Sequence, residues 1–202
     1  MRRMIVSDFQ TNCYIENNDL KEAFIVDPGG NGKKIWKYLS ENELQLKAIL
    51  LTHGHIDHIG AVEYLYNKTH CLVYAHQETI ELVKDASMNL SAVFGEPYVL
   101  NVPIIEAEDE FEVIGYKMRW YFMPGHCQGS SMIYMIDKQV MFSGDVLFKG
   151  SIGRYDFPTS SHYDTKCSLE KIKAFDFDCH VLPGHGDFTT LNEEKKNNPY
   201  LR

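Results

Sequence analysis

Four apolar runs in this chain each lead directly into a histidine or an aspartate. AILLT precedes His53, WYFMPG precedes His126, VMFSG precedes Asp145 and VLPG precedes His185, and a glycine stands immediately before three of these four residues. Apolar runs of this length are typical of buried strands. If the strands end at a common edge of the fold, the four polar side chains gather at one site. The need to bring the ends of four strands to one edge constrains the fold more than any other feature of the sequence.

Strand patterns and helix patterns occur in both halves of the chain. Strands are expected at residues 4–9, 12–17, 22–27, 48–52, 71–75, 104–115, 116–123, 131–137, 140–145 and 179–183. Helices are expected at residues 33–44, 59–69, 76–94, 165–175 and within 189–201. Since each layer buries its apolar face against another layer, this order predicts an α/β fold in which two sheets, the first opening antiparallel, pack inside flanking helices. No linker interrupts the pattern, so we expect a single domain over residues 1–202.

The segment LTHGHIDHIG, residues 51–60, crowds three histidines and an aspartate into six positions. Burying so many polar groups in one loop costs free energy unless something compensates them, and a divalent cation supplies that compensation. His53, His55 and Asp57 are spaced by two, so in an extended segment their side chains point the same way. His58 breaks this period, which allows Asp57 and His58 to serve a different ion from His53 and His55. The alternative, a set of solvated loop histidines, is disfavoured by the matching histidines and aspartate downstream.

The composition argues against several classes of partner. The net charge is −8 and no basic patch is visible, which argues against nucleic acid. No apolar stretch approaches the roughly 18 residues of a membrane helix, and MRRMIVSDFQ lacks the apolar run of a signal peptide. The five cysteines form no CxxC pair, so neither a disulfide framework nor a cysteine-rich zinc site is expected. We therefore expect a cytoplasmic protein with a small-molecule partner, and the sequence is silent on its oligomeric state.

The histidine cluster and the downstream motifs together resemble one family. HGHIDH resembles the HxHxDH signature of the metallo-β-lactamase superfamily, and MPGHCQGS, FSGDVLF and LPGHG match its further motifs in order. Through SGDVLFKGSIGRYDFP, VLPGHG and TTLNEEKKNNPYL the chain is most similar to the compact glyoxalase II-like (hydroxyacylglutathione hydrolase-like) group. This resemblance covers nearly the whole chain. It implies an αββα four-layer sandwich with two mixed sheets, a site at one edge, and no C-terminal helical substrate-binding domain.

The resemblance also implies a complete set of metal ligands. It assigns His53, His55 and His126 to one ion and Asp57, His58 and His185 to a second, with Asp145 bridging both. The implied cofactor is a pair of divalent metal ions. We expect zinc, although five histidines and two aspartates also suit iron or manganese.

A pair of divalent ions held by these ligands indicates a hydrolase. Metal coordination lowers the pKa of water from about 15.7 towards 7, so hydroxide is available at neutral pH, and the positive charge of the centre favours a tetrahedral oxyanion. We expect attack of a metal-bridging hydroxide, oriented by the catalytic Asp57, on a thioester such as S-lactoylglutathione. A thiol with a pKa of about 8.5 leaves without a dedicated acid.

Other activities fit the same ligands. Persulfide dioxygenases share the histidine pattern but use one iron, and an ester, lactone or lactam would be cleaved by the same chemistry. A non-catalytic metal-binding protein is disfavoured because all seven ligand positions are intact.

Three residues near the motifs are assigned supporting roles. Cys127 stands where the family usually has threonine, and we expect it to pack behind the ligands, with approach to a metal ion as the alternative. Arg154 and Asp156 lie in GRYDFP, beyond Asp145. We expect them to form a buried pair that braces the metal-binding loop, with substrate contact as the alternative.

Overall fold

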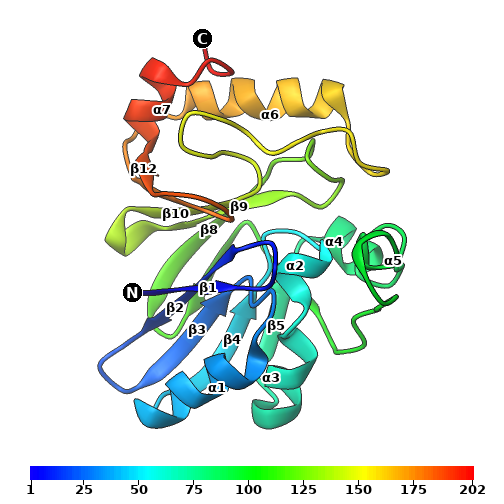
Figure 1. Ribbon diagram of the computed structural model, residues 1–202. Coiled ribbons are helices and arrows are strands. Elements are labelled where there is room, and N and C mark those ends of the chain that lie inside the picture. Colours follow the sequence, from blue (N-terminus) through cyan, green and yellow to red (C-terminus); the bar gives the residue numbers. More distant parts are fainter.

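The first sheet gathers the strands of the amino-terminal half in the order β1-β2-β3-β4-β5-β6 (Figure 1). The computed structural model describes residues 1–202. The strands of this sheet are β1 (Arg2–Val6), β2 (Thr11–Asn17), β3 (Glu22–Val26), β4 (Gln45–Leu50), β5 (Leu72–Ala75) and β6 (Ile105–Glu106). As predicted, β1, β2 and β3 pair antiparallel. From β3 onwards the pairs are parallel, because a helical connection returns the chain to the same end of the sheet each time.

The second sheet holds the remaining strands in the order β12-β11-β10-β9-β8-β7. They are β7 (Glu110–Val113), β8 (Tyr116–Phe122), β9 (Ser131–Met135), β10 (Val140–Gly144), β11 (His180–Pro183) and β12 (Thr189–Thr190). All pairs in this sheet are antiparallel except β10 with β11, which are joined through a long helix and run parallel. Both sheets are therefore mixed.

Helices cover the outer face of each sheet, which gives four layers (Figure 1). The first sheet carries α1 (Gly32–Glu41) and α3 (Val62–Thr69), and the second carries α6 (His162–Ala174) and α7 (Leu191–Asn197). Ile35 and Leu39 of α1 lie one turn apart and are fully buried against the first sheet. Between the sheets lies an apolar core that includes Tyr14, Phe24 and Phe142. The predicted αββα sandwich is confirmed.

Three short helices and one turn complete the fold: α2 (Ile56–Ile59), α4 (Gln77–Leu82), α5 (Ser91–Phe94) and the 3-10 turn η1 (Ile136–Lys138). None of the helices combines the length and the apolar content that a bilayer crossing requires.

The single helix predicted over residues 76–94 is wrong, because the structure divides it into α4 and α5. Between them, the Asp85 carboxylate accepts hydrogen bonds from the backbone N–H groups of Ser87 (2.8 Å) and Met88 (3.2 Å). Leu90 then adopts a left-handed conformation with φ 66°. Aspartate side chains that bond nearby backbone in this way compete with helical hydrogen bonding, and the apolar periodicity did not reveal this local competition.

The single strand predicted over residues 104–115 is also wrong. Its first part, β6, pairs with β5 in the first sheet, and its second part, β7, pairs with β8 in the second sheet. The chain crosses between the sheets in the interval 107–109. Helix α6 begins three residues before the predicted start, because the Ser161 hydroxyl accepts a hydrogen bond from the Asp164 N–H and caps the helix.

Candidate metal centre

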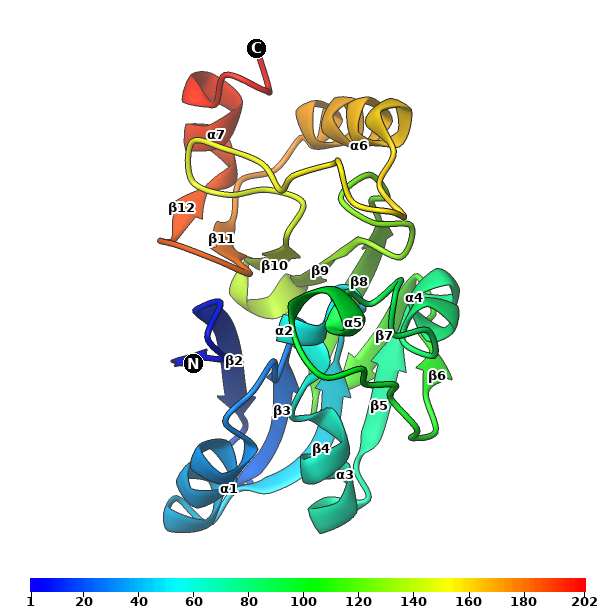
Figure 2. The ribbon, with the colours of Figure 1, turned by 45° about the vertical axis from the view of Figure 1, so that its right-hand side comes forward.

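The ends of four strands bring distant residues to one place. His53 follows β4, Asp145 follows β10 and His185 follows β11, while His126 lies in the loop after β8. Asp57 and His58 belong to α2, directly beyond the end of β4. Figure 2 shows α2 and α5 at the seam between the two sheets. The structure thus collects all seven sequence-predicted ligand residues along this seam.

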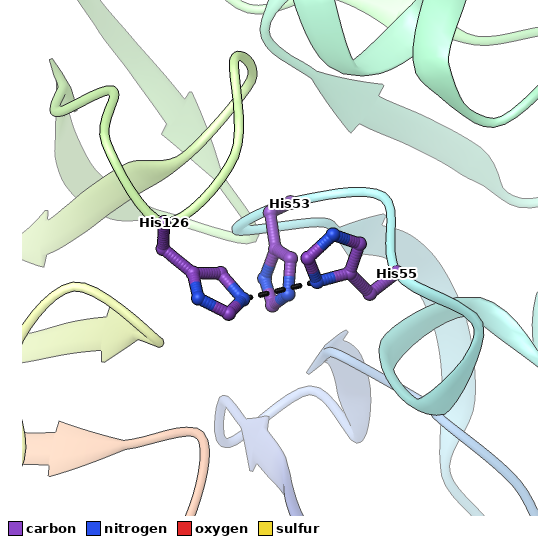
Figure 3. Close-up of side chains that lie close together, drawn as sticks. All are labelled: His53, His55 and His126. Carbon is purple, nitrogen blue, oxygen red and sulfur yellow. Dashed lines mark hydrogen bonds between the residues drawn. The ribbon is translucent and has the colours of Figure 1, made fainter. Parts of the chain in front are cut away.

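His53, His55 and His126 form the first ligand group, which we call the histidine trio. One ring nitrogen of each lies within 4.8 Å of those of the other two, and His126 Nε2 lies 3.0 Å from His55 Nδ1 (Figure 3). All three residues are buried. The trio therefore concentrates ring nitrogens at a largely buried position, where His55 and His126 line one end of a cavity.

Hydrogen bonds orient two rings of the trio. His126 Nδ1 donates to the backbone oxygen of Arg154 at 2.7 Å. His53 Nδ1 lies 3.2 Å from the Thr52 hydroxyl oxygen, which itself donates to Asp27 at 2.6 Å and so accepts from the ring. A neutral histidine whose Nδ1 carries the proton presents a lone pair on Nε2. Both Nε2 atoms are thereby left as acceptors.

The trio is uncharged at neutral pH. Burial, followed by the nearby imidazoles of His58 and His55, holds the pKa of His53 well below 6.5. Burial lowers the pKa of His55 to about 3 and also lowers the pKa of His126. Neutral imidazole is the form that binds transition metals.

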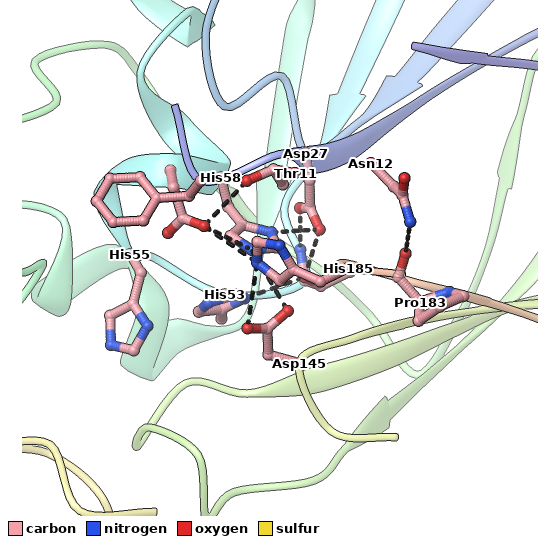
Figure 4. Close-up of polar contacts among 12 residues, drawn as sticks. Thr11, Asn12, Asp27, His53, His55, His58, Asp145, Pro183 and His185 are labelled. Carbon is pink, nitrogen blue, oxygen red and sulfur yellow. Dashed lines mark hydrogen bonds and ion pairs between the residues drawn. The ribbon is translucent and has the colours of Figure 1, made fainter. Parts of the chain in front are cut away.

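Asp57, His58 and His185 form the second ligand group, which we call the acidic group (Figure 4). His185 Nε2 lies 3.1 Å from Asp57 Oδ2, and His58 Nε2 lies 3.5 Å from the same oxygen. The two histidine Nε2 atoms are 3.4 Å apart. His58 is fully buried, whereas Asp57 and His185 are partly open.

Asp145 stands between the two groups. Its Oδ1 lies 3.4 Å from His58 Nε2, whereas its Oδ2 lies 3.7 Å from His126 Nε2 and 3.5 Å from His185 Nε2. One carboxylate thus faces both groups at once. This is the position that a bridging ligand requires.

The acidic group differs from the trio because its side chains are ionised. Burial alone would lower the pKa of His58, but Asp57, Asp145 and Asp27 raise it well above 6.5. Burial would raise the pKa of Asp57, but His58 and His185 hold it far below its usual range. Burial would likewise raise the pKa of Asp145, but His58 most strongly, then His126 and His185, lower it. The carboxylates of Asp57 and Asp145 are therefore ionised, and the imidazoles of His58 and His185 favour positive charge close to them.

Asp27 is a site residue that the sequence reasoning missed. It follows β3, is buried, and accepts hydrogen bonds from the Thr52 N–H (2.8 Å) and the Thr52 hydroxyl (2.6 Å). Its Oδ2 lies 2.9 Å from His58 Nδ1. Asp27 thus orients a ring in each group. The signal was present, since AFIVDPGG is also an apolar run that ends in an aspartate, here followed by Pro-Gly-Gly, but only a strand was predicted over residues 22–27.

Strand β2 also positions the centre, and no sequence motif indicated this. The Thr11 hydroxyl donates to Asp57 Oδ2 at 2.9 Å. The Asn12 amide donates to the backbone oxygens of Pro183 (3.0 Å, Figure 4) and Gly186 (2.9 Å). The Tyr14 hydroxyl donates to the Pro183 oxygen at 2.6 Å. The first sheet therefore holds the loop of the second sheet that carries His185.

The three residues with expected supporting roles lie close to the trio. Cys127 is fully buried, its Sγ lies 3.2 Å from the Ser130 hydroxyl, and burial raises the pKa of its thiol to about 11. Arg154 and Asp156 do pair, at 2.8 and 3.0 Å, but both side chains are about two-thirds exposed (64% and 65%). The expectation of a buried pair is wrong, because GRYDFP runs along the surface and only the Arg154 backbone contacts the trio.

The residues present fit divalent cations. His53 Nε2, His55 Nε2 and Asp145 Oδ1 are buried polar atoms without a hydrogen-bond partner, and such atoms are costly unless something binds them. Backbone geometry also keeps space open, because a Cβ on Gly184 would lie 2.2 Å from Asp145 Oδ1. Imidazole and carboxylate ligands suit zinc, iron and manganese. The trio, the acidic group and Asp145 would hold two such ions.

Comparisons with known proteins agree with this geometry. The family model described as the metallo-beta-lactamase superfamily matches residues 6–185. A probable metallo-hydrolase, YqgX of Bacillus subtilis, is 38% identical over 99% of this chain and 96% of its own. Hydroxyacylglutathione hydrolase GloC of Haemophilus influenzae is 34% identical over 97% of this chain and 95% of its own.

Solved structures match over the full length as well. BLEG-1, described as a B3 metallo-beta-lactamase, superposes with a TM-score of 0.92 at 35% identity, covering 99% of this chain and 98% of its own. TTHA1623, solved in a di-iron-bound form, superposes with a TM-score of 0.89 at 31% identity, covering 100% of both chains.

Proposed function

This chain belongs to the metallo-beta-lactamase superfamily, and we propose that it is a metal-dependent hydrolase that cleaves thioesters such as S-lactoylglutathione. The observation that carries the proposal is the position of Asp145, whose two oxygens face the histidine trio and the acidic group. The likeness to a hydroxyacylglutathione hydrolase over nearly the whole chain supports the thioester substrate.

Two divalent cations bound by these residues would polarise a carbonyl group and make hydroxide available at neutral pH. We expect zinc, with iron as the alternative that the di-iron form of TTHA1623 supports. The trio, the acidic group and Asp145 would hold these ions, and Asp27 would keep the rings of His53 and His58 in place through its hydrogen bonds.

Asp57 has a second role in this proposal. Its Oδ2 faces Thr11, His58 and His185, which leaves Oδ1 to accept a hydrogen bond from the attacking water and so orient it. The neutral trio is largely buried beside the position of the reacting carbonyl, and burial strengthens electrostatic interactions there. No side chain is needed to protonate the leaving group, because a thiol with a pKa of about 8.5 departs as thiolate.

A second candidate reaction is hydrolysis of β-lactams. The likeness to BLEG-1 supports it, at 35% identity over nearly the full length. The same ligand groups would serve both reactions, so the two candidates differ only in the substrate that the neighbouring cavity accepts.

Metal analysis paired with turnover tests the proposal. Freshly purified protein is expected to contain two divalent ions per chain and to hydrolyse S-lactoylglutathione, with activity lost to a chelator and restored by zinc or iron. A single iron per chain, with sulfite formed from a persulfide and no thioester cleaved, would identify an oxygenase instead. Faster cleavage of a β-lactam than of any thioester would favour the second candidate.

A further inference from the structure

The cavity beside the ligand groups has an unusually simple chemical lining. It has a volume of about 330 Å³, and its polar lining consists of five ligand residues and Arg154. The rest of the lining is apolar: Phe9, Ile56, Leu90, Phe94, Phe148 and Phe157. No hydroxyl or amide side chain lines it. Away from the ligand residues and Arg154, a substrate group that carries hydrogen-bonding atoms would therefore lose its water without gaining a protein side-chain partner.

Three phenylalanines from separate segments form one continuous apolar wall of this cavity. The ring centroids of Phe9 and Phe94 are 5.3 Å apart, and those of Phe94 and Phe157 are 6.5 Å apart. The Phe157 ring lies 5.4 Å from that of His55 and 5.7 Å from that of His126. We call Phe9, Phe94 and Phe157 the aromatic wall. It starts at the histidine trio and extends outwards to the surface.

Each part of the aromatic wall is anchored to the metal centre. The loop that carries Phe157 is held by His126, whose Nδ1 donates to the Arg154 oxygen and whose backbone oxygen accepts from the Ser160 hydroxyl. The segment before Phe94 is held by the Ile56 N–H, which donates to the Asn89 oxygen at 2.8 Å. The Phe9 N–H donates to the Ser7 hydroxyl, which lies 3.2 Å from the hydroxyl of Thr11, the partner of Asp57. The wall is thus fixed relative to the ligands.

The outer part of the wall is open to solvent. Phe9 is 45% exposed and Phe94 is 48% exposed. Covering such rings with a ligand releases free energy in proportion to the apolar area removed from water. The guanidinium of Arg154 lies 4.4 Å from the Phe157 ring and is already paired with Asp156, so the rim offers little unpaired charge to a substrate.

We propose that the aromatic wall selects thioesters whose acyl group is an uncharged hydrocarbon, aliphatic or aromatic. This inference rests on the proposed function and narrows its substrate class. The carbonyl must lie beside the ligand groups, and Phe157 contacts the rings of two ligands, so a group bonded directly to the carbonyl reaches the wall. The thiol portion then extends towards solvent. A 2-hydroxyacyl group, by contrast, would place its hydroxyl against phenylalanine rings.

Glutathione thioesters that share one leaving group test this inference. With metal-loaded protein, kcat/KM for S-phenylacetylglutathione is expected to exceed that for S-lactoylglutathione by roughly tenfold or more, the range that apolar contacts provide. The variant Phe94→Ala is expected to lower kcat/KM for the phenylacetyl substrate roughly tenfold and to change that for the lactoyl substrate by less than about threefold. Val93→Ala is the matched control, since Val93 is an exposed neighbour of Phe94 on α5 that does not line the cavity.

Binding of the product acids provides a readout that does not depend on turnover. Phenylacetate is expected to bind the metal-loaded protein more tightly than lactate by calorimetry, and Phe94→Ala is expected to remove the difference. Equal kcat/KM for both thioesters, or equal effects of Phe94→Ala and Val93→Ala, overturns the inference and leaves the proposed function intact. Failure of fully metal-loaded protein to cleave any thioester overturns both.

Discussion

The histidine trio and the acidic group lie side by side, yet the protein builds them differently. The trio is uncharged, and two of its rings are oriented by a backbone oxygen and a hydroxyl. The acidic group carries both signs of charge, and its side chains are held by Asp27 and Thr11 from other strands. The difference teaches that the trio rings contact uncharged partners and reach Asp27 only through Thr52, whereas the acidic group contacts the Asp27 carboxylate directly. Four substitutions test this contrast.

The largest effect is expected where the two groups meet. Asp145→Asn preserves shape but removes the charge that faces both groups, so both are expected to lose metal and activity is expected to fall at least about 100-fold. Metal quantification and thioester turnover measure this, and circular dichroism checks the fold. Wild-type activity of Asp145→Asn with two bound ions would contradict a bridging role for Asp145.

Asp27→Asn is expected to affect the acidic group more than the trio. Loss of its charge weakens the hydrogen bond to His58, and losing such an outer partner of a metal ligand typically costs 10–100-fold in metal affinity. Competition with a chelator measures the affinity of each ion. Asp178→Asn is the matched control, because the Asp178 carboxylate also accepts two hydrogen bonds, in this case from the backbone N–H groups of Cys179 and Asn192. Equal effects of the two variants would contradict the assignment.

A smaller effect is expected at Thr11. Thr11→Val removes the hydrogen bond to Asp57 at nearly constant volume and is expected to weaken metal binding by the acidic group roughly tenfold, whereas Thr11→Ser restores it. The same chelator competition measures both variants. If valine and serine behave alike, Thr11 contributes packing and does not position Asp57.

The smallest effect is expected on the trio side. Ser160→Ala removes the hydroxyl that donates to the His126 oxygen and accepts from the Phe157 N–H. We expect a loss of about 1 kcal/mol in the free energy of unfolding and little change in metal affinity, because the His126 ring keeps its bond to the Arg154 oxygen. Urea unfolding and chelator competition measure these quantities. A loss of metal affinity as large as that of Asp27→Asn would contradict the proposed difference between the histidine trio and the acidic group.

The sequence predicted those features that depend on local pattern. The arrangement of two sheets inside flanking helices followed from apolar runs and helical periodicity, and the gathering of His126, Asp145 and His185 followed from their place at strand ends. The support from Thr11, Asn12 and Tyr14 could not be predicted, because these hydrogen bonds depend on how the two sheets pack together. The division of residues 76–94 into two helices depended on one side chain, Asp85, bonding to nearby backbone.

The hydrogen bonds from β2 to the Pro183–Gly186 loop join residues about 170 positions apart, since Asn12 is separated from Pro183 by 171 residues. A polypeptide emerging from the ribosome exposes its HGHIDH segment long before His185 is synthesised. Closing so long a loop must wait for the final strands to dock, so a growing chain holds only a partial set of ligands. The complete set of seven ligand residues is therefore assembled only when the second sheet is complete.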